Sequence, residues 1–216
     1  MFSLHEPAWV IRRIRDSDNG IYLTFDDGPS PQTTPAVLEL LKKYDAKATF
    51  FVIGQKAEAQ SELIHRIITE GHTLLSHSSD HAYSNYFKGS NAIENWMHDS
   101  VNKLQKITNA QALGFRPPAG VLNPPLLRAA QRIKLPLILW SYRYFDSVWS
   151  LTSRKIHRSL KRLKSGDIVL LHDEQKIKNQ KIFLKSLEEL LQGLALAQLK
   201  VRALSNSDII NSCRFA

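Results

Sequence analysis

The chain has 216 residues and a formal net charge of +9, with 43% hydrophobic and 23% charged residues. This length and composition are typical of one compact globular domain and argue against wholesale disorder. The lone Cys213 excludes an internal disulfide framework and a thiolate metal site. No stretch reaches the ~18 to 20 consecutive apolar residues that a membrane span requires.

The first 19 residues, which we interpret as an N-terminal extension, carry charges at positions 5–6 and 12–16. They therefore lack the uninterrupted apolar region of ~7 to 15 residues that is expected of a signal peptide. The compartment stays open. A full-length chain of this kind would be cytoplasmic or membrane-peripheral, whereas a chain that has lost a leader would be exported.

Seven short apolar runs predict strands, and longer segments with helical spacing of apolar positions lie between them. The predicted strands are 21–25, 49–53, 73–77, 113–116, 135–141, 167–172 and 201–205. The predicted helices are 34–44 and segments near 57–70, 92–109, 122–132, 151–163 and 180–197. Such alternation favours a parallel sheet covered by helices. Because no linker interrupts it, we predict one α/β barrel-like domain over 20–206, followed by a C-terminal tail over 207–216.

Basic residues gather in two segments, 153–164 and 174–185. We interpret them as the solvated outer faces of two amphipathic helices, with a patch facing a membrane surface or a polyanion as the alternative. No interleaving of aromatic and basic residues accompanies the charge, which argues against nucleic acid as a partner.

Two carboxylates, Asp26 and Asp27, end the first predicted strand, and Gly28-Pro29 then forces a tight turn. Adjacent carboxylates repel each other unless a cation lies between them or one of them is protonated. The same four residues also make a common turn, so this motif alone leaves both interpretations open.

His77 and His81 stand four positions apart at the end of the third predicted strand. If the chain turns helically there, their imidazoles converge on one side. Imidazole is the usual neutral nitrogen ligand of zinc, and two histidines with one carboxylate leave coordination positions open for water. Together with the paired aspartates at another strand end, they predict a metal site.

Arg116 and His172 lie at the ends of two further strands. Arg116 precedes Pro117-Pro118, where its guanidinium can orient a carboxylate. His172 could serve as a proton donor. Taken singly, Arg116 could equally be a solvated arginine in a rigid loop, and His172 could be a structural histidine.

In this order, the motifs resemble the polysaccharide deacetylase family with the NodB homology domain, also known as carbohydrate esterase family 4. The matching motifs are T-F-D-D-G-P, H-S-x-x-H, R-P-P-x-G and L-x-H, with the connecting runs 46–51 and 69–77. The resemblance covers roughly residues 20–205. It implies a distorted, TIM-barrel-like (β/α)7 barrel, in which parallel strands are surrounded by helices.

The resemblance also implies roles for individual residues. It implies a divalent metal held by Asp27, His77 and His81, most often Zn²⁺, with Co²⁺ or Mn²⁺ as alternatives. By the same resemblance, Asp26 is the general base, Arg116 orients Asp26, and His172 donates a proton to the leaving amine. The backbone N–H of Ala119 binds the oxyanion, and Leu170 lines the acyl pocket.

The fourth motif of the family, D-x-x-D-W, is altered in the segment 140–149 of this chain. Asp146 fits the second acidic position, which in the family pairs with the catalytic histidine. Arg143 occupies the first acidic position, and Ser147 replaces the tryptophan. We expect Trp149 or Tyr144 to fill the gap in the pocket wall. The altered wall leaves the acyl group and the sugar preference open.

Two weaker expectations concern the loop after His77. Ser78 either hydrogen-bonds within the metal loop or is only a turn residue. The aromatic residues further along could stack on a sugar ring, or could form a small hydrophobic cluster; they are Tyr83, Tyr86 and Phe87.

The leading hypothesis for function is metal-dependent removal of an N-acyl group, foremost N-acetyl, from an N-acetylglucosamine-type sugar in peptidoglycan or another glycan. The first alternative is a de-N-acylase or deformylase of a lipid-linked amino sugar at a membrane surface, which the positive charge favours. The second is a catalytically silent carbohydrate-binding protein of the same fold. Expected partners are an amino-sugar glycan or glycolipid, with peripheral contact to an anionic membrane as an option. The oligomeric state is not predicted.

Overall fold

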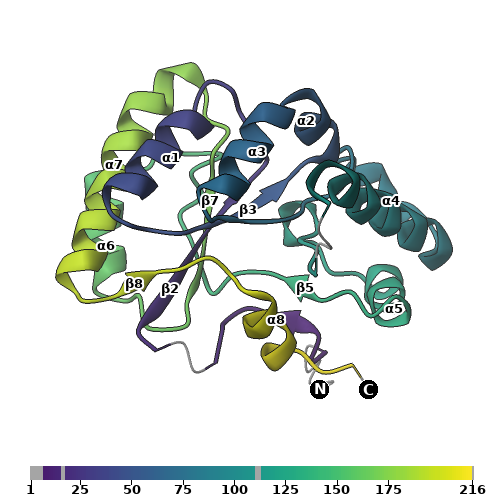
Figure 1. Ribbon diagram of the computed structural model, residues 1–216. Helices are drawn as coiled ribbons and strands as arrows, with labels where there is room; N and C mark the ends of the chain where they lie inside the picture. Colours follow the sequence, from purple (N-terminus) through teal and green to yellow (C-terminus); the bar gives the residue numbers. More distant parts are fainter. Residues whose placement is uncertain (1–6, 16–17, 110–112, 216) are drawn as a thin grey trace.

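A computed structural model describes residues 7–15, 18–109 and 113–215 and shows parallel strands enclosed by helices (Figure 1). The strands are β1 Val10–Ile11, β2 Gly20–Asp26, β3 Thr49–Val52, β4 Thr73–Ser76, β5 Leu137–Ile138, β6 Tyr142–Arg143, β7 Ile168–His172 and β8 Lys200–Val201. The α-helices are α1 Thr34–Lys43, α2 Gly54–Ala59, α3 Ser61–Thr69, α4 Ser90–Thr108, α5 Pro124–Arg132, α6 Ser153–Leu160, α7 Ile177–Leu196 and α8 Asn206–Ser212. Two 3-10 helices are η1 Tyr83–Phe87 and η2 Pro118–Gly120.

The strands form one curved, parallel arrangement centred on β2. The main sheet has the order β4-β3-β2-β7-β6, β8 pairs with the start of β2, and β1 pairs with β5. Single parallel bridges from Phe115 to Ser76 and to Leu137 connect β4 with β5. The segment 137–143 then passes from Phe115 to β7, and so completes a distorted barrel. The predicted α/β fold, with parallel strands surrounded by helices, is confirmed.

The hydrophobic core explains why β2 lies at the centre. All seven residues of β2 are buried, and Phe25 stacks on Phe50 of β3 with ring centroids 5.1 Å apart. Behind the sheet, α7 contributes a leucine stripe at the spacing of one helix face; it consists of Leu187, Leu190, Leu191 and Leu194. In Figure 1 α1 and α7 lie side by side on this side of the sheet, and the two helices contact each other. This packing holds the carboxyl ends of β2 and β7 next to each other.

Several elements differ from the sequence prediction. The predicted strand 113–116 is wrong as a strand, because only Phe115 bridges its neighbours; Pro117 and Pro118 lack the N–H groups that a longer ladder needs. The predicted helix 57–70 divides at Gln60 into α2 and α3. The two-residue strands β1 and β6 and the helix α8 were not predicted.

The division into an extension, a domain over 20–206 and a tail stays a prediction. Within the described residues, β1 of the extension pairs with β5, and Ile209 of α8 is buried in the core. Residues 1–6, 16–17 and 216 lie outside the described part of the chain. Among the helices of the described ranges, none combines the length and the apolar character that crossing a membrane requires.

Candidate metal-dependent active site

The site lies where β2, β4 and β7 end. Residues of parallel strands that pair in register lie beside each other, and the register places Asp26 next to His172, one of the predicted acid–base residues. Two residues earlier on each strand, and therefore on the same face of the sheet, Thr24 lies next to Leu170. Functional side chains from distant parts of the sequence therefore meet at one end of the barrel, as expected for parallel α/β folds.

Asp27, His77 and His81 form a cluster that can hold a divalent metal. Each offers a ligand atom, and these atoms lie within 4.8 Å of one another. Asp27 Oδ1 lies 3.3 Å from His81 Nε2 and 3.5 Å from His77 Nε2. The same oxygen is buried and has no hydrogen-bond partner. An orphaned carboxylate oxygen facing two imidazole nitrogens fits a bound cation, because a cation would satisfy all three groups.

The loop between the two histidines brings them together by a bend rather than by the helical turn that we expected. Ser78 and His81 both have positive φ, 74° and 56°, and the loop contains no helix. The hydroxyl of Ser78 accepts a hydrogen bond from the backbone N–H of His81 at 2.9 Å, which is the first of the two alternatives for this residue.

The ring of His77 is oriented by a second contact. Its Nδ1 lies 2.7 Å from the carbonyl oxygen of Arg116. Donation from Nδ1 to this carbonyl turns Nε2 towards Asp27, the arrangement that is usual for a metal-binding histidine.

The electrostatics of the cluster also favour ligand forms without protons. Burial by itself raises the pKa of Asp27, but the close approach of His77, together with His172 and His81, holds that pKa well below its usual range. Burial, reinforced by the neighbouring His77, lowers the pKa of His81. A carboxylate and neutral imidazoles are the forms that bind divalent ions.

Arg116 holds the carboxylate of Asp26. The guanidinium is fully buried and donates to Asp26 Oδ1 at 2.6 Å and to Thr24 Oγ1 at 2.8 Å. It also donates to the backbone carbonyls of residues 138 and 139, and it lies 3.7 Å from the ring centroid of Phe51. These contacts compensate a charge that burial would otherwise make very costly. The predicted pairing of Arg116 with Asp26 is present in the structure.

His172 forms a second charge-assisted pair, with Asp146. Its Nδ1 lies 2.9 Å from Asp146 Oδ1, and its backbone N–H donates to Asp146 Oδ2 at 2.8 Å. Burial by itself lowers the pKa of His172, but the hydrogen bond and charge of Asp146 raise it to about 9. The imidazole therefore carries a proton near neutral pH, with Nε2 free to donate it.

Of the four residues predicted to contact the substrate, the structure leaves three available to the site and turns the fourth, Tyr144, away from it. Leu170 lies on the inner face beneath His172, and Ala119 occupies the exposed turn η2 with a positive φ of 53°. Trp149 is 61% exposed and lies against Phe145. The structure does not bring Tyr144 to the site: its ring is buried in the core, and its hydroxyl lies 2.5 Å from Ser159 Oγ of α6.

Three contributors to the site escaped the sequence prediction. Trp140 packs so closely over the R-P-P-x-G turn that a Cβ on Gly120 would lie 2.4 Å from its ring. Gln175 donates to Asp146 Oδ2 at 3.2 Å. Asp173 is buried beneath Gly28 and accepts a hydrogen bond from Thr34; burial raises its pKa to about 7. No sequence pattern marks these contacts, since each depends on tertiary packing.

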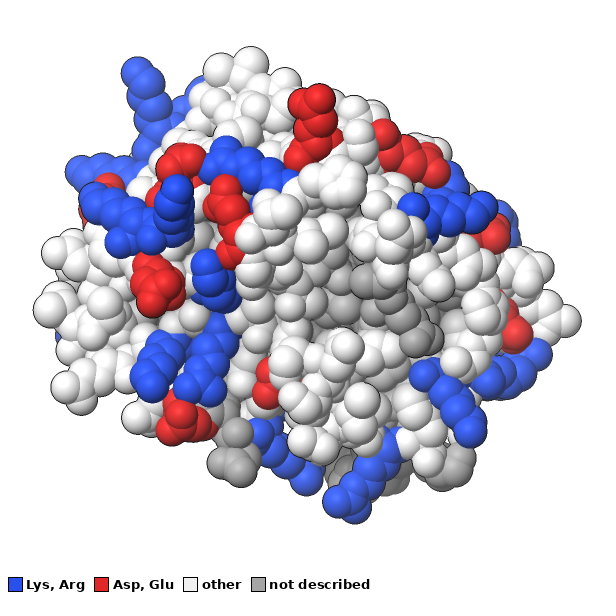
Figure 2. Space-filling view, in the orientation of Figure 1, with Lys and Arg blue, Asp and Glu red and all other residues white. Residues whose placement is uncertain are grey.

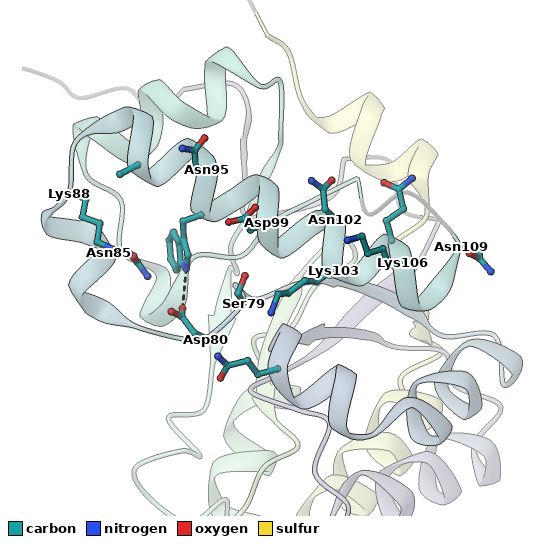
Figure 3. Close-up of a pocket in the computed structure, with 14 residues that line it drawn as sticks. Ser79, Asp80, Asn85, Lys88, Asn95, Asp99, Asn102, Lys103, Lys106 and Asn109 are labelled. Atoms are coloured by element: carbon teal, nitrogen blue, oxygen red, sulfur yellow. Dashed lines mark hydrogen bonds between the residues drawn. The ribbon is translucent and has the colours of Figure 1, made fainter.

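A polar groove of about 990 Å³ lies beside the metal loop, along α4 (Figure 3). It begins at Ser79 and Asp80, between the two histidines, and Asp80 accepts a hydrogen bond from the indole of Trp96 at 3.1 Å. Figure 3 shows polar side chains following α4 along the groove; among them are Asn95, Asp99, Asn102, Lys106 and Asn109. The contact with Trp96 ties the metal loop to α4.

The aromatic residues after the loop divide between the two predicted roles. Tyr83 is half exposed and its ring lies edge-on to His81 at 5.2 Å. Tyr86 is buried and packs against Trp96, whereas Phe87 is exposed. Tyr83 is therefore the aromatic side chain at the rim of the metal cluster.

Comparisons with known proteins agree with this geometry. Residues 13–138 match the model of the polysaccharide deacetylase family. A peptidoglycan-N-acetylglucosamine deacetylase of Bacillus cereus is 34% identical over 79% of this chain and 80% of its own length. A chitooligosaccharide deacetylase of Bradyrhizobium sp. is 33% identical over 77% of this chain and 78% of its own length.

Solved structures show the same fold. A family 4 carbohydrate esterase from Streptomyces lividans superposes with a TM-score of 0.76 and 25% identity, over 86% of this chain and 93% of its own. A family 4 pseudoenzyme from Bacillus anthracis superposes with a TM-score of 0.79 and 22% identity, over 93% of this chain and 68% of its own. Because the same fold occurs in a pseudoenzyme, activity has to be argued from the site residues.

Proposed function

We propose that this chain, which belongs to the polysaccharide deacetylase family, hydrolyses the N-acetyl group of an N-acetylglucosamine-type unit. The unit would be part of a glycan such as peptidoglycan or a chito-oligosaccharide. The names of its relatives support this substrate class. One observation carries the proposal: the Asp27, His77 and His81 cluster lies at the same barrel end as a carboxylate held by arginine and a histidine paired with an aspartate.

We further propose that the resident ion is Zn²⁺. The residues that would hold it are Asp27, His77 and His81, and their one oxygen and two nitrogens suit zinc, although Co²⁺ or Mn²⁺ can use similar ligands. A bound divalent ion supplies Lewis-acid polarisation of the acyl carbonyl and lowers the pKa of water.

In the proposed reaction Asp26 accepts a proton from the attacking water, while Arg116 keeps this carboxylate charged and oriented. The backbone N–H of Ala119 donates to the oxyanion that forms on the acyl carbon. His172 then gives the proton on Nε2 to the leaving amine, and Asp146 stabilises the imidazolium. The products are acetate and a free amino sugar.

We place the acyl methyl group against Leu170, which is 5% exposed on the inner face of β7. Trp149 and Phe145 would form the outer wall next to Asp146, where the family carries a tryptophan. Tyr144 has no place in this proposed pocket, because its side chain faces α6.

A second candidate is removal of an acyl or formyl group from a lipid-linked amino sugar. A cavity between β6 and α6, lined by Arg143 and Arg158 among other basic residues, favours it over other rivals because lipid-linked sugars carry phosphate. A silent binding protein is disfavoured, since the base, the acid and all three candidate ligands are retained.

A substrate panel tests the proposed function. Zinc-reconstituted protein would be incubated with chito-oligosaccharides, peptidoglycan fragments and lipid-linked amino sugars, and acetate and formate would be quantified. We expect acetate from at least one of the first two. Release of formate from the lipid-linked sugar alone would favour the second candidate, and no release from any substrate by metal-loaded protein would contradict both.

A further inference from the structure

A second cavity, of about 500 Å³, lies between β6 and α6 and is lined almost entirely by basic side chains. We call it the basic groove. Two tyrosines, Tyr142 and Tyr144, form its wall, and its five cations are Arg143, Lys155, Arg158, Lys161 and Arg162.

Several basic residues in the described part of the chain form ion pairs with carboxylates, whereas these five cations do not. In the described part of the chain, no ion pair joins any of the five to a carboxylate. By contrast, Arg66 pairs with both Glu39 and Glu70, and Lys43 pairs with Glu188. Figure 2 shows basic and acidic side chains side by side on one face of the molecule. Five like charges around one concavity repel each other, so the groove favours an anionic occupant.

The basic groove adjoins the candidate active site. Arg143 lies 3.9 Å from the ring centroid of Phe145, and the next residue, Asp146, holds His172. On the α6 side, Lys155 donates to the carbonyl of Ser150 at 3.0 Å and lies 5.9 Å from the ring centroid of Trp149. The segment 143–149 therefore connects the groove to the residue that holds His172.

We propose that the basic groove binds an oxyanion, carboxylate or phosphate, that the glycan substrate itself carries close to the acylated sugar. Arginine and lysine side chains recognise both oxyanions, and three guanidinium groups suit bidentate contacts. A concave site suits a group on a bound glycan better than a flat membrane surface, and Arg143 of the groove pairs in register with Leu170, two residues before His172. This inference rests on the proposed function, because it specifies which substrates that site prefers.

The test compares neutral with anionic substrates in two charge-matched variants. The groove variant combines Arg158→Gln, Lys161→Gln and Arg162→Gln, which leaves the site residues untouched. The control variant carries three lysine-to-glutamine changes on exposed positions of α7; these are Lys178→Gln, Lys181→Gln and Lys185→Gln. The substrates are chitotetraose, which is neutral, a muropeptide with free carboxylates and a phosphate-linked amino sugar.

We expect the groove variant to raise KM about tenfold for at least one anionic substrate, the sum expected of three partly exposed ion pairs, with chitotetraose unchanged. The control variant should match the unaltered protein on every substrate. Which anionic substrate responds identifies carboxylate or phosphate. An equal change on chitotetraose, no change on any substrate, or an equal loss in the control variant would overturn the proposal.

Binding provides a readout that does not depend on turnover. Isothermal titration of the same glycans into proteins that also carry Asp26→Asn should show the same selective loss in the groove variant. If the unaltered protein releases no acyl group, the proposed function fails, and this titration still decides the role of the groove. Loss of binding to phosphatidylglycerol vesicles with unchanged glycan binding would assign the groove to lipid headgroups and overturn the proposal.

Discussion

The carboxylate of Asp26 has two oxygens with different surroundings. Oδ1 accepts the hydrogen bond from Arg116 at 2.6 Å, and Oδ2 faces the metal cluster, 3.7 Å from His77 Nε2. One oxygen is therefore held in place while the other faces the candidate metal ligands. This division suits a general base that must stay charged in a buried place.

Replacing Asp26 by Asn should abolish most turnover while keeping the metal. The amide cannot accept the proton of water, so we expect a drop in kcat of ~10² to 10⁴-fold. Stability should also fall, because Arg116 keeps a buried charge without its carboxylate. Acetate release and metal content would be measured below the melting temperature of the variant. Activity equal to that of the unaltered protein would refute the role as base.

We expect the pKa of His172 to set the alkaline limit of activity. Its pKa is raised to about 9 by Asp146, and only the protonated imidazole can donate to the leaving amine. Activity should therefore fall as pH rises through the pKa of His172. In Asp146→Asn the charge that raises this pKa is lost, and the alkaline limb of the kcat profile should move to lower pH. An unmoved limb would show that another group sets it.

At the scale of secondary-structure elements, His72 lies just before β4 and contacts the residue just before β3. His72 Nδ1 accepts a hydrogen bond from the backbone N–H of Ala48 at 3.1 Å, so the ring must be neutral there. Burial, reinforced by Lys47, lowers the pKa of His72 from 6.5 to about 4. A depressed folded-state pKa contributes stability that is present above the unfolded value and is lost as pH falls through the folded value.

Urea unfolding should detect this loss. Between pH 7 and pH 5, His72 should account for about 2 kcal/mol of lost unfolding free energy. The variant His72→Gln keeps an acceptor without a titrating ring, so its stability should change less over the same interval. The exposed His98→Gln serves as the control and should keep the full pH dependence. Equal pH dependence in all three proteins would contradict the assignment.

Strands and helices with strong apolar patterns were predictable from the sequence. The continuous run of β2 and the apolar spacing of α1 and α7 set these elements, and the ends of β2 and β4 lead into Asp27 and His77, which the structure brings into one cluster. The two-residue strands β1 and β6 are too short to show a pattern. The helix α8 does carry a signal that was overlooked, a capping box between Ser205 and Asp208.

Tertiary contacts account for the remaining differences. Tyr144 and Trp149 were equivalent candidates in the sequence, but Tyr144, directly after β6, is buried against Ser159 of α6, whereas Trp149 lies in an exposed bend. Similarly, nothing in the sequence near Thr34 indicates that its hydroxyl contacts Asp173 beneath the turn at Gly28. Such contacts depend on how helices and strands pack together, which local patterns do not encode.

For the whole molecule, the fold brings the ends of β2, β4 and β7 together, so that the candidate ligands and the acid–base pair share one barrel end. The basic groove lies beside this end, between β6 and α6. The net charge of +9 therefore does not come only from basic residues scattered over the solvent-exposed surface. It includes a concentration of unpaired cations next to the candidate active site.

Metal stoichiometry measured together with acetate release tests the central claim most directly. Metal-free protein would be titrated with Zn²⁺, and both quantities would be followed in the unaltered protein, in His81→Ala and in the control His98→Ala. We predict that activity rises to a plateau at one bound ion in the unaltered protein and the control. His81→Ala should lose both the tightly bound ion and the activity, because one of three ligands is gone. Full activity without metal, or one tightly held ion in His81→Ala, would contradict the proposed metal site.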